Sequence, residues 1–132
     1  MRNTGLVIDP KQELAAYLNL ARDYFELGKP RVVLVMLVCA AVGMALAVPG
    51  LPDIWLAMTG LVGIGLAAMG AAAFNHLLDR RLDKLMLRTS RRPVAEGRIG
   101  DWQAAAYACL LSLAGLGLLW SEVNPLTAIL TA

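Results

Sequence analysis

Residues 54–78 have the sequence IWLAMTGLVGIGLAAMGAAAFNHLL, in which no side chain carries a formal charge at pH 7. Two more uncharged runs lie on either side of this stretch, at residues 32–52 and 102–121. An α-helix of about 20 residues crosses the roughly 30 Å hydrocarbon core of a bilayer, and each run is long enough. The sequence therefore predicts an all-α fold, a polytopic transmembrane helical bundle with complete spans at about 32–48, 54–74 and 103–120.

The composition of the whole chain agrees with a membrane environment. Of its 132 residues, 58% are hydrophobic and only 17% are charged, and the mean hydropathy is +0.61. Soluble domains typically carry about 25% charged residues. These values exclude a disordered chain, a coiled coil, a disulfide scaffold and a nucleic-acid-binding arm. The lipid bilayer is therefore an expected partner, and nucleic acid is not.

The basic side chains indicate which side of the membrane each connection faces. All twelve Lys and Arg residues fall into two clusters, one before residue 32 and one between residues 80 and 98. Because cytoplasmic connections are enriched in Lys and Arg, the N-terminus and the 75–101 segment are predicted to be cytoplasmic. The first residues resemble neither a secretory signal nor an Arg-rich transit peptide. The expected location is the bacterial inner membrane, with an organellar membrane as the open alternative.

Two flanking segments complete the predicted organisation, a single partial domain over residues 1–132. Residues 10–27 begin with a capping pattern and repeat apolar side chains at helical spacing, as in an amphipathic helix at the membrane interface. Residues 126–132 begin a fourth apolar run that holds only seven residues. A span cannot be built from seven residues, so we expect a longer protein whose fourth span begins here. The many Gly and Ala residues of 54–74 predict that this span packs closely against other helices.

The most informative polar residues lie where the second predicted span meets the cytoplasm. Asn75, Asp79 and Asp83 are spaced four apart. If the helix continues past Phe74, successive members differ by only about 40° around its axis and form one stripe. An amide oxygen and two carboxylates are ligands suited to Mg²⁺, which also shares substrate phosphates. A second interpretation stays open, in which both Asp residues pair on a solvated face with the nearby cations Arg80, Arg81 and Lys84.

Arginines follow this stripe closely. They lie at Arg88, Arg91, Arg92 and Arg98. A divalent cation that bridges carboxylates to phosphate, with guanidinium groups on the remaining oxygens, forms a diphosphate site. Such a site promotes cleavage of a C–O bond because it stabilises the leaving diphosphate. The segment 75–101 is therefore the predicted catalytic segment.

Three segments together carry a resemblance to a known family. They are YFELGKPR at 24–31, NHLLDRRLD at 75–83 and MLRTSRRP at 86–93, the last followed by Gly97-Arg98-Ile99. KPR before an apolar span, followed by NxxxDxxxDxxMxRTxxRP, is a compound pattern with a low probability of chance occurrence. From about residue 22 onward, the chain resembles the N-terminal part of the UbiA-type intramembrane prenyltransferases. Within that family it most resembles the branch that farnesylates haem.

The resemblance implies a bundle of nine helices around a central cavity and a Mg²⁺-dependent reaction. Farnesyl would pass from farnesyl diphosphate to a vinyl group of haem b, a substrate rather than a cofactor, giving haem O for terminal oxidases. Association with haem A synthase or with terminal oxidase assembly is a further expectation. The implied catalytic and metal-binding residues are Asn75, Asp79 and Asp83, and the implied diphosphate contacts are Arg88 and Arg92, with Lys29 and Arg31 as weaker candidates.

One departure from the family pattern limits this interpretation. The family places a second Asp-rich motif in its C-terminal half, and no acidic cluster follows Asp101 in this chain, so the chain alone is expected to be inactive.

His76 is predicted to be a packing or interfacial residue rather than a haem ligand. The open alternatives are a UbiA-type enzyme acting on a quinone precursor or a chlorophyll-like acceptor, and a small non-catalytic membrane subunit. A CDP-alcohol phosphotransferase is disfavoured because its DGxxAR element is absent.

Overall fold

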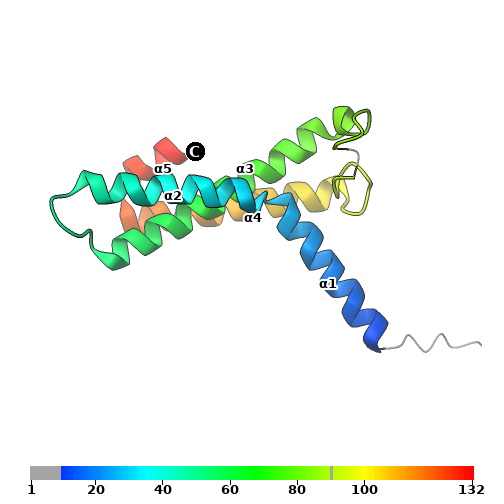
Figure 1. Cartoon of the computed structure of the whole chain (residues 1–132), viewed down its shortest axis with the longest axis horizontal. Helices are drawn as coiled ribbons and strands as arrows, with labels where there is room; N and C mark the ends of the chain where they lie inside the picture. Colours follow the sequence, from blue (N-terminus) through cyan, green and yellow to red (C-terminus); the bar gives the residue numbers. More distant parts are fainter. Residues whose placement is uncertain (1–9, 90) are drawn as a thin grey trace, which may run out of the picture.

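The computed structural model of the chain describes residues 10–89 and 91–132, and its described part is helical without a strand (Figure 1). The longest helix, α3, contains the predicted stripe, and a π-helical segment, η1, directly continues α4. In chain order the elements are α1 (Pro10–Leu27), α2 (Pro30–Ala47), α3 (Ile54–Asp83), α4 (Asp101–Leu118), η1 (Leu119–Val123) and α5 (Pro125–Thr131).

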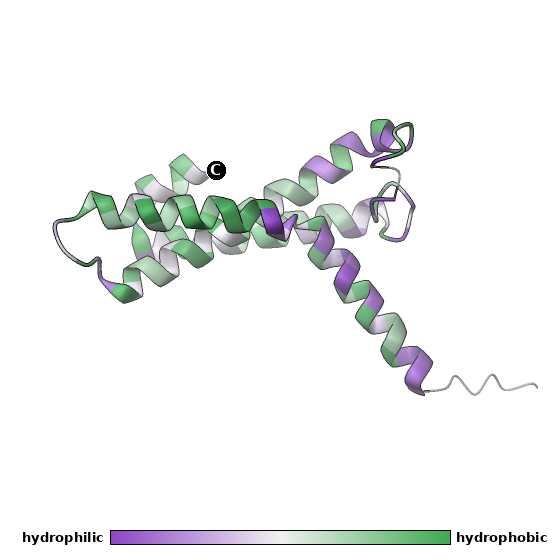
Figure 2. Ribbon diagram, viewed as in Figure 1, coloured by the Kyte–Doolittle hydropathy of each residue, from purple (hydrophilic) through white to green (hydrophobic). Residues whose placement is uncertain are grey.

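Three of these helices are long and apolar enough to cross a membrane: α2, α3, and α4 together with η1. They lie roughly side by side, and their apolar character contrasts with the polar character of α1 (Figure 2). A third of the apolar window of α3 is buried, against 6% for α2, so α3 is the central helix of the three. The prediction of an all-α polytopic bundle is confirmed.

The contact between α3 and α4 depends on glycine. Gly63 and Gly70 of α3 and Gly115 of α4 are buried where the two backbones approach each other. A Cβ atom placed on Gly115 would lie 2.6 Å from the backbone nitrogen of Ala67 and 2.6 Å from the carbonyl oxygen of Gly63. Small residues allow such approach within a bilayer, where packing replaces the hydrophobic effect as the force between helices. The predicted close packing of this span is confirmed.

At one end of the bundle the chain becomes polar, and α3 extends into this region as far as Asp83. We call residues 79–101 and the facing C-terminal half of α1 the polar end. The described residues of the loop 84–100 fold back in turns, and Val94 and Ile99 are buried against α1, α3 and α4. Leu85, Met86 and Leu87, at the start of the loop, are exposed. The resulting small core consists of Leu27, Ala73, Val94, Ile99, Ala104 and Ala108, with Tyr24, Phe74, Leu77 and Tyr107 packed against it.

The direction of α1 is set by the two residues that join it to α2. α1 ends at Leu27, and the amides of Gly28 and Lys29 donate to the carbonyls of Phe25 and Glu26. Lys29 adopts the left-handed backbone conformation (φ 48°, ψ 58°), and Pro30 then begins α2. For a residue other than glycine this conformation costs about 1 kcal/mol. The bend sends α1 obliquely away from the bundle (Figure 1), so most of its side chains are exposed.

Candidate functional site

The three residues of the predicted stripe all lie on the last turns of α3. Because the helix is unbroken past Phe74, Asn75, Asp79 and Asp83 share one side of it, as the spacing predicts. Their surroundings differ. Asn75 is exposed, Asp79 is half-buried, and Asp83 is 4% exposed. The stripe therefore passes from the open surface of the helix into the packed polar end.

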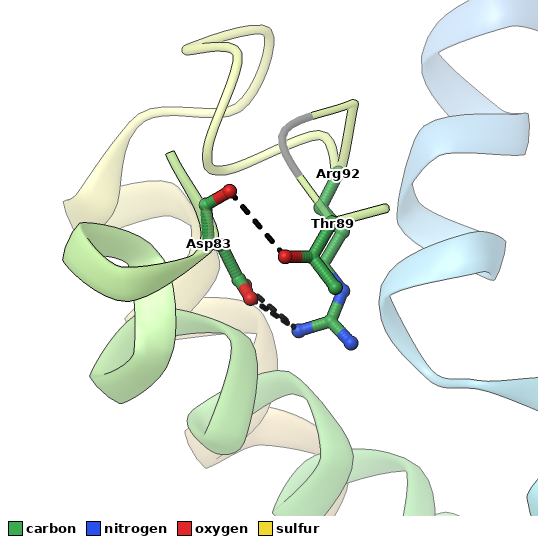
Figure 3. A network of polar contacts seen from close by, with 3 residues as sticks. All are labelled: Asp83, Thr89 and Arg92. Carbon is green, nitrogen blue, oxygen red and sulfur yellow. Dashed lines mark hydrogen bonds and ion pairs between the residues drawn. The ribbon is translucent and has the colours of Figure 1, made fainter. Parts of the chain in front are cut away.

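Asp83 is bound to Arg92 (Figure 3). The Nη1 group of Arg92 donates to both carboxylate oxygens of Asp83 at 2.8 Å. The hydroxyl of Thr89 donates to the backbone carbonyl of Asp83 at 3.3 Å. Thr89 and Arg92 of the loop therefore cover the end of α3 at Asp83, the most buried residue of the stripe.

The ion pairs of the stripe differ from those of the alternative interpretation, in which both aspartates bind neighbouring cations. Asp83 binds a cation nine residues further along the chain, and Arg80 pairs instead with Asp101 at the start of α4. Within the described residues, the side chains of Asn75 and Asp79 take part in no hydrogen bond or ion pair. Their oxygen atoms therefore remain available for a ligand.

The donor set suits a shared magnesium site better than a closed one. The described residues contain no group of three or more His, Cys, Asp or Glu side chains close enough to enclose a metal ion. Mg²⁺ usually keeps several waters and binds through one or two carboxylates together with substrate phosphates. Asn75 and Asp79 supply a free amide oxygen and a free carboxylate at adjacent turns, and Asp83 supplies a carboxylate already bound to Arg92. These oxygens fit a cation that is held jointly by protein and diphosphate.

A cavity of about 650 Å³ lies beside the stripe, between α1, the first turn of α2, α3 and the loop. It contains three of the four basic residues predicted to bind diphosphate, Lys29, Arg31 and Arg92, whereas the fourth, Arg88, is exposed and outside the lining. The residues that line it are Arg22, Phe25, Glu26, Lys29, Pro30, Arg31, Val32, His76 and Arg92. Asn75 and Asp79 are not among them, although they lie on the same turns of α3 as His76.

Arg22 and His76 are among the lining residues that the sequence did not assign to a site. Arg22 lies one helical turn before Glu26 on α1, and the sequence signal for it was the spacing of four residues that places both on one face. His76 is buried, as expected for a packing histidine, but it also lines the cavity. Its only sequence signal was its position directly after Asn75.

A second ion pair holds the wall of the cavity in place. Nη1 of Arg98, at the end of the loop, donates to Oδ1 of Asp23 on α1, and Nε of Arg98 lies 2.8 Å from Oε2 of Glu96. Nη2 of Arg98 donates to the carbonyl of Arg91 at 3.0 Å. Asp23 is buried and directly follows Arg22 of the cavity wall. The loop therefore fixes the position of α1 relative to α3.

Comparison with known proteins identifies the family of the chain. The sequence model of the UbiA prenyltransferase family matches residues 36–132, which include α3, the loop and α4. The chain belongs to the UbiA prenyltransferase family. The part of α1 that forms the cavity wall precedes the region that this UbiA model matches.

Two curated relatives of this UbiA chain are both named protoheme IX farnesyltransferase. The chain is 51% identical over 113 residues to the protoheme IX farnesyltransferase of Photobacterium profundum, and the matched region covers 86% of the chain and 35% of that relative. It is 54% identical over 122 residues to the protoheme IX farnesyltransferase of Legionella pneumophila strain Corby, covering 92% of the chain and 42% of that relative. The chain thus spans well under half the length of these relatives. No solved structure matches it.

Proposed function

We propose that the protein containing this chain transfers the farnesyl group of farnesyl diphosphate to a vinyl group of haem b, producing haem O. The observation that carries the proposal is the end of α3, where the unpaired oxygens of Asn75 and Asp79 lie on the same helix as Asp83, whose partner Arg92 lines a cavity walled by cations. The names of the relatives, protoheme IX farnesyltransferase, support haem as the acceptor. The activity is assigned to the whole protein, because the second Asp-rich motif expected for the family is not among these residues.

In this proposal the polar end binds the diphosphate and stabilises it as it leaves. Mg²⁺ bound by the stripe would supply positive charge to the diphosphate oxygens. Asn75 and Asp79 would hold it, with Asp83 as the third member of the set. Arg92 uses Nη1 on Asp83, so its Nη2 and Nε groups remain for phosphate oxygens. Arg88, Lys29 and Arg31 are the further predicted contacts.

Cleavage of the C–O bond releases diphosphate and leaves an allylic cation on the farnesyl group. The vinyl group of haem attacks this cation, and a water molecule then adds to the cation formed next to the porphyrin ring and loses a proton, which gives the hydroxyl group of haem O. Water would also capture the farnesyl cation itself, so the first step needs a site from which water is excluded. The apolar faces of α2, α3 and α4 provide a membrane environment for the farnesyl chain next to the polar end. In this proposal the diphosphate lies at the aqueous boundary and the hydrocarbon chain lies within the bilayer.

The proposed orientation places the N-terminus and the polar end in the cytoplasm. Two clusters of basic residues flank the first two spans on the same side, as cytoplasmic segments of bacterial inner-membrane proteins do. The same location would give access to haem A synthase or terminal oxidase assembly as partners that use haem O.

The test is a comparison of acceptors. The full-length protein, in membranes, is incubated with farnesyl diphosphate and either haem b or 4-hydroxybenzoate, with Mg²⁺ or with EDTA, and products are identified by mass. We expect farnesylated haem with Mg²⁺ and none with EDTA. Prenylation of the benzoate but not of haem would show a quinone-precursor enzyme instead, and no prenylation of any acceptor would favour a non-catalytic subunit.

A further inference from the structure

One side of α1 is apolar and exposed. Leu14, Leu18, Ala21 and Phe25 are spaced four, three and four residues apart, so they lie within about 60° of one another around the helix. The side chains of Leu14, Leu18 and Phe25 are 61%, 62% and 58% exposed. We call these four residues the outer face of α1. Contiguous exposed apolar surface of this kind marks a site of interaction.

The bundle contacts the other side of α1. Asp23 and Leu27 are 7% and 0% exposed, and Asp23 binds Arg98 of the loop while Leu27 belongs to the small core of the polar end. Each of these two residues is two positions from Phe25, which corresponds to about 160° around the helix axis. The apolar residues of the outer face therefore do not serve to pack α1 against the loop.

The outer face is turned toward the membrane. Only Gly28 and Lys29 separate α1 from α2, a helix long and apolar enough to span a bilayer. Two residues extend over at most about 7 Å, so the end of α1 lies at the surface that α2 enters. Here Phe25 of the outer face lines the same cavity as Val32 in the first turn of α2. Because Asp23, on the opposite side, faces the polar loop, the outer face is directed to the lipid side of α1.

The outer face also extends beyond the bundle. Leu14 precedes Leu27 by thirteen residues, which is about 20 Å along the helix. Figure 1 shows α1 leaving the bundle obliquely, and Figure 2 shows hydrophobic and hydrophilic residues alternating along it. The UbiA family model matches residues 36–132, so α1 lies before the region that defines the bundle of the family. The surface within reach of Leu14 and Leu18 is therefore the membrane around the spans.

The charges beside the outer face favour anionic lipid. The two segments on the polar side of the spans contain all twelve basic residues of the chain and eight of its ten acidic residues, so this side is net positive. Lys11 and Arg22 are eleven residues apart, about three turns, and flank the same edge of the outer face. Tyr17, which is 68% exposed, lies at the other edge. Basic residues attract anionic headgroups, and tyrosine is enriched at the membrane interface.

We propose that α1 is a membrane-surface anchor whose outer face inserts between the headgroups of the leaflet next to the polar end, with Lys11 and Arg22 binding anionic lipid. Amphipathic helices of this kind lie with the apolar face about 5–10 Å into the boundary between headgroups and acyl chains. α1 is then held from two sides, by lipid on the outer face and by Arg98 on Asp23. Only the identity of the leaflet, the cytoplasmic one, depends on the orientation proposed above.

Spin labelling of the full-length protein in lipid nanodiscs tests the position of α1. Cys39 and Cys109, both exposed, are first replaced by alanine, and a nitroxide is attached at Leu18→Cys or at Ala16→Cys. Both positions are exposed in the structure, but they differ by about 160° around α1. Collisions of the nitroxide are measured with oxygen, which concentrates in lipid, and with a water-soluble nickel complex. We expect oxygen to dominate at Leu18→Cys and nickel to dominate at Ala16→Cys.

Further variants test the chemistry of insertion. In the protein labelled at Leu18→Cys, Leu14→Gln should lower the ratio of inserted to free α1 about tenfold, because one leucine no longer buries its apolar area. Ala16→Gln places the same side chain on the opposite side and should leave the ratio unchanged. Insertion should be stronger in discs that contain phosphatidylglycerol than in pure phosphatidylcholine, and salt should reduce the difference. Equal insertion in both discs would refute the role of Lys11 and Arg22.

Two results would overturn the anchor. Dominant collisions with nickel at both labelled positions would show that α1 projects into water. An immobilised label at Leu18→Cys that neither reagent reaches would show that protein covers the outer face, and label–label broadening would identify that protein as a second copy of the chain. The acceptor assay separates this proposal from the proposed function. Farnesylation of haem with α1 in water would refute the anchor alone, and insertion of α1 in a protein that farnesylates no acceptor would refute the function alone.

Discussion

In the middle of the bundle, α3 and α4 approach so closely that glycines lie at their contact, whereas at the polar end α1, α3 and the loop are joined by charged side chains. The first contact leaves no room for one added carbon at Gly115. The second contains every ion pair that the structure shows among the described residues. The packing of α3 on α4 therefore requires small residues at the contact, whereas the polar end requires specific pairs of charged side chains.

This difference predicts different responses to substitution. A larger side chain at the contact between α3 and α4 should lower the stability of the bundle, because the association of helices within lipid depends on close packing. A change of charge should act on the polar end, where it either removes a ligand or leaves a partner unpaired. Four substitutions distinguish these two kinds of response.

The largest effect is expected from a charge that the structure leaves free. Asp79→Ala in the full-length protein should reduce farnesyl transfer by at least about 100-fold, because it removes a carboxylate that would hold charge against the leaving diphosphate. Its fold should be unaffected, since the Asp79 side chain has no ion pair in the described structure. The checks are turnover and thermal unfolding. Glu122→Gln, exposed in η1, is the control expected to keep full activity. Undiminished turnover in Asp79→Ala would contradict the assigned role.

The next effect lies in the middle of the bundle and concerns stability. Gly115→Ala should destabilise the protein by about 2–3 kcal/mol, because the new Cβ would meet backbone atoms of α3 that cannot move aside. Gly117→Ala, two residues away with nothing within 4 Å, should be neutral or slightly stabilising. Denaturation in detergent micelles measures both. Equal stability of the two variants would show that α3 and α4 do not pack as described.

A smaller effect on stability is expected at the end of α3. Arg92→Ala leaves the buried carboxylate of Asp83 without the two hydrogen bonds at 2.8 Å, which should cost about 2 kcal/mol locally. Hydrogen exchange of the loop amides should therefore become faster. Arg91→Ala keeps the backbone carbonyl that Arg98 uses and should leave the exchange unchanged. Similar exchange in both variants would mean that Arg92 does not hold the loop.

The smallest effect is expected where α1 joins the polar end. Asp23→Asn weakens the contact with Arg98, which is 42% exposed, so the loss should be at most about 1 kcal/mol and should shrink at high salt. Proteolysis or hydrogen exchange confined to α1 would detect it. Glu13→Gln, on the exposed part of the same helix, is the control. An effect spread over α3 and α4 would contradict a local role for this pair.

The same division explains which features the sequence could predict. The spans follow from uncharged runs long enough to cross a bilayer, and the stripe follows from residues four apart on one continuous helix. Both are local properties of a helix with a fixed period. α3 indeed continues past Phe74 to Asp83, and the glycines of 54–74 do mark a close contact.

The ion pairs at the polar end cannot be predicted from the periodicity of a helix. Asp83 and Arg92 are nine residues apart across several turns, and Asp23 and Arg98 are 75 apart. Which cation meets which carboxylate depends on how the loop folds back and on the bend at Lys29, where a residue other than glycine adopts a positive φ. For the same reason the cavity at His76 could not be predicted, since its walls come from α1, α2, α3 and the loop.

The ion pair between Asp23 and Arg98 also has a consequence for the order of synthesis. Asp23 leaves the ribosome 75 residues before its partner, an interval of roughly 4–15 s at 5–20 residues per second. During that interval two spans are made, and α1 has not yet gained the ion pair that joins it to the loop. α1 therefore reaches its final position later than its place in the chain suggests, and the cavity that it walls is completed only after the loop has emerged.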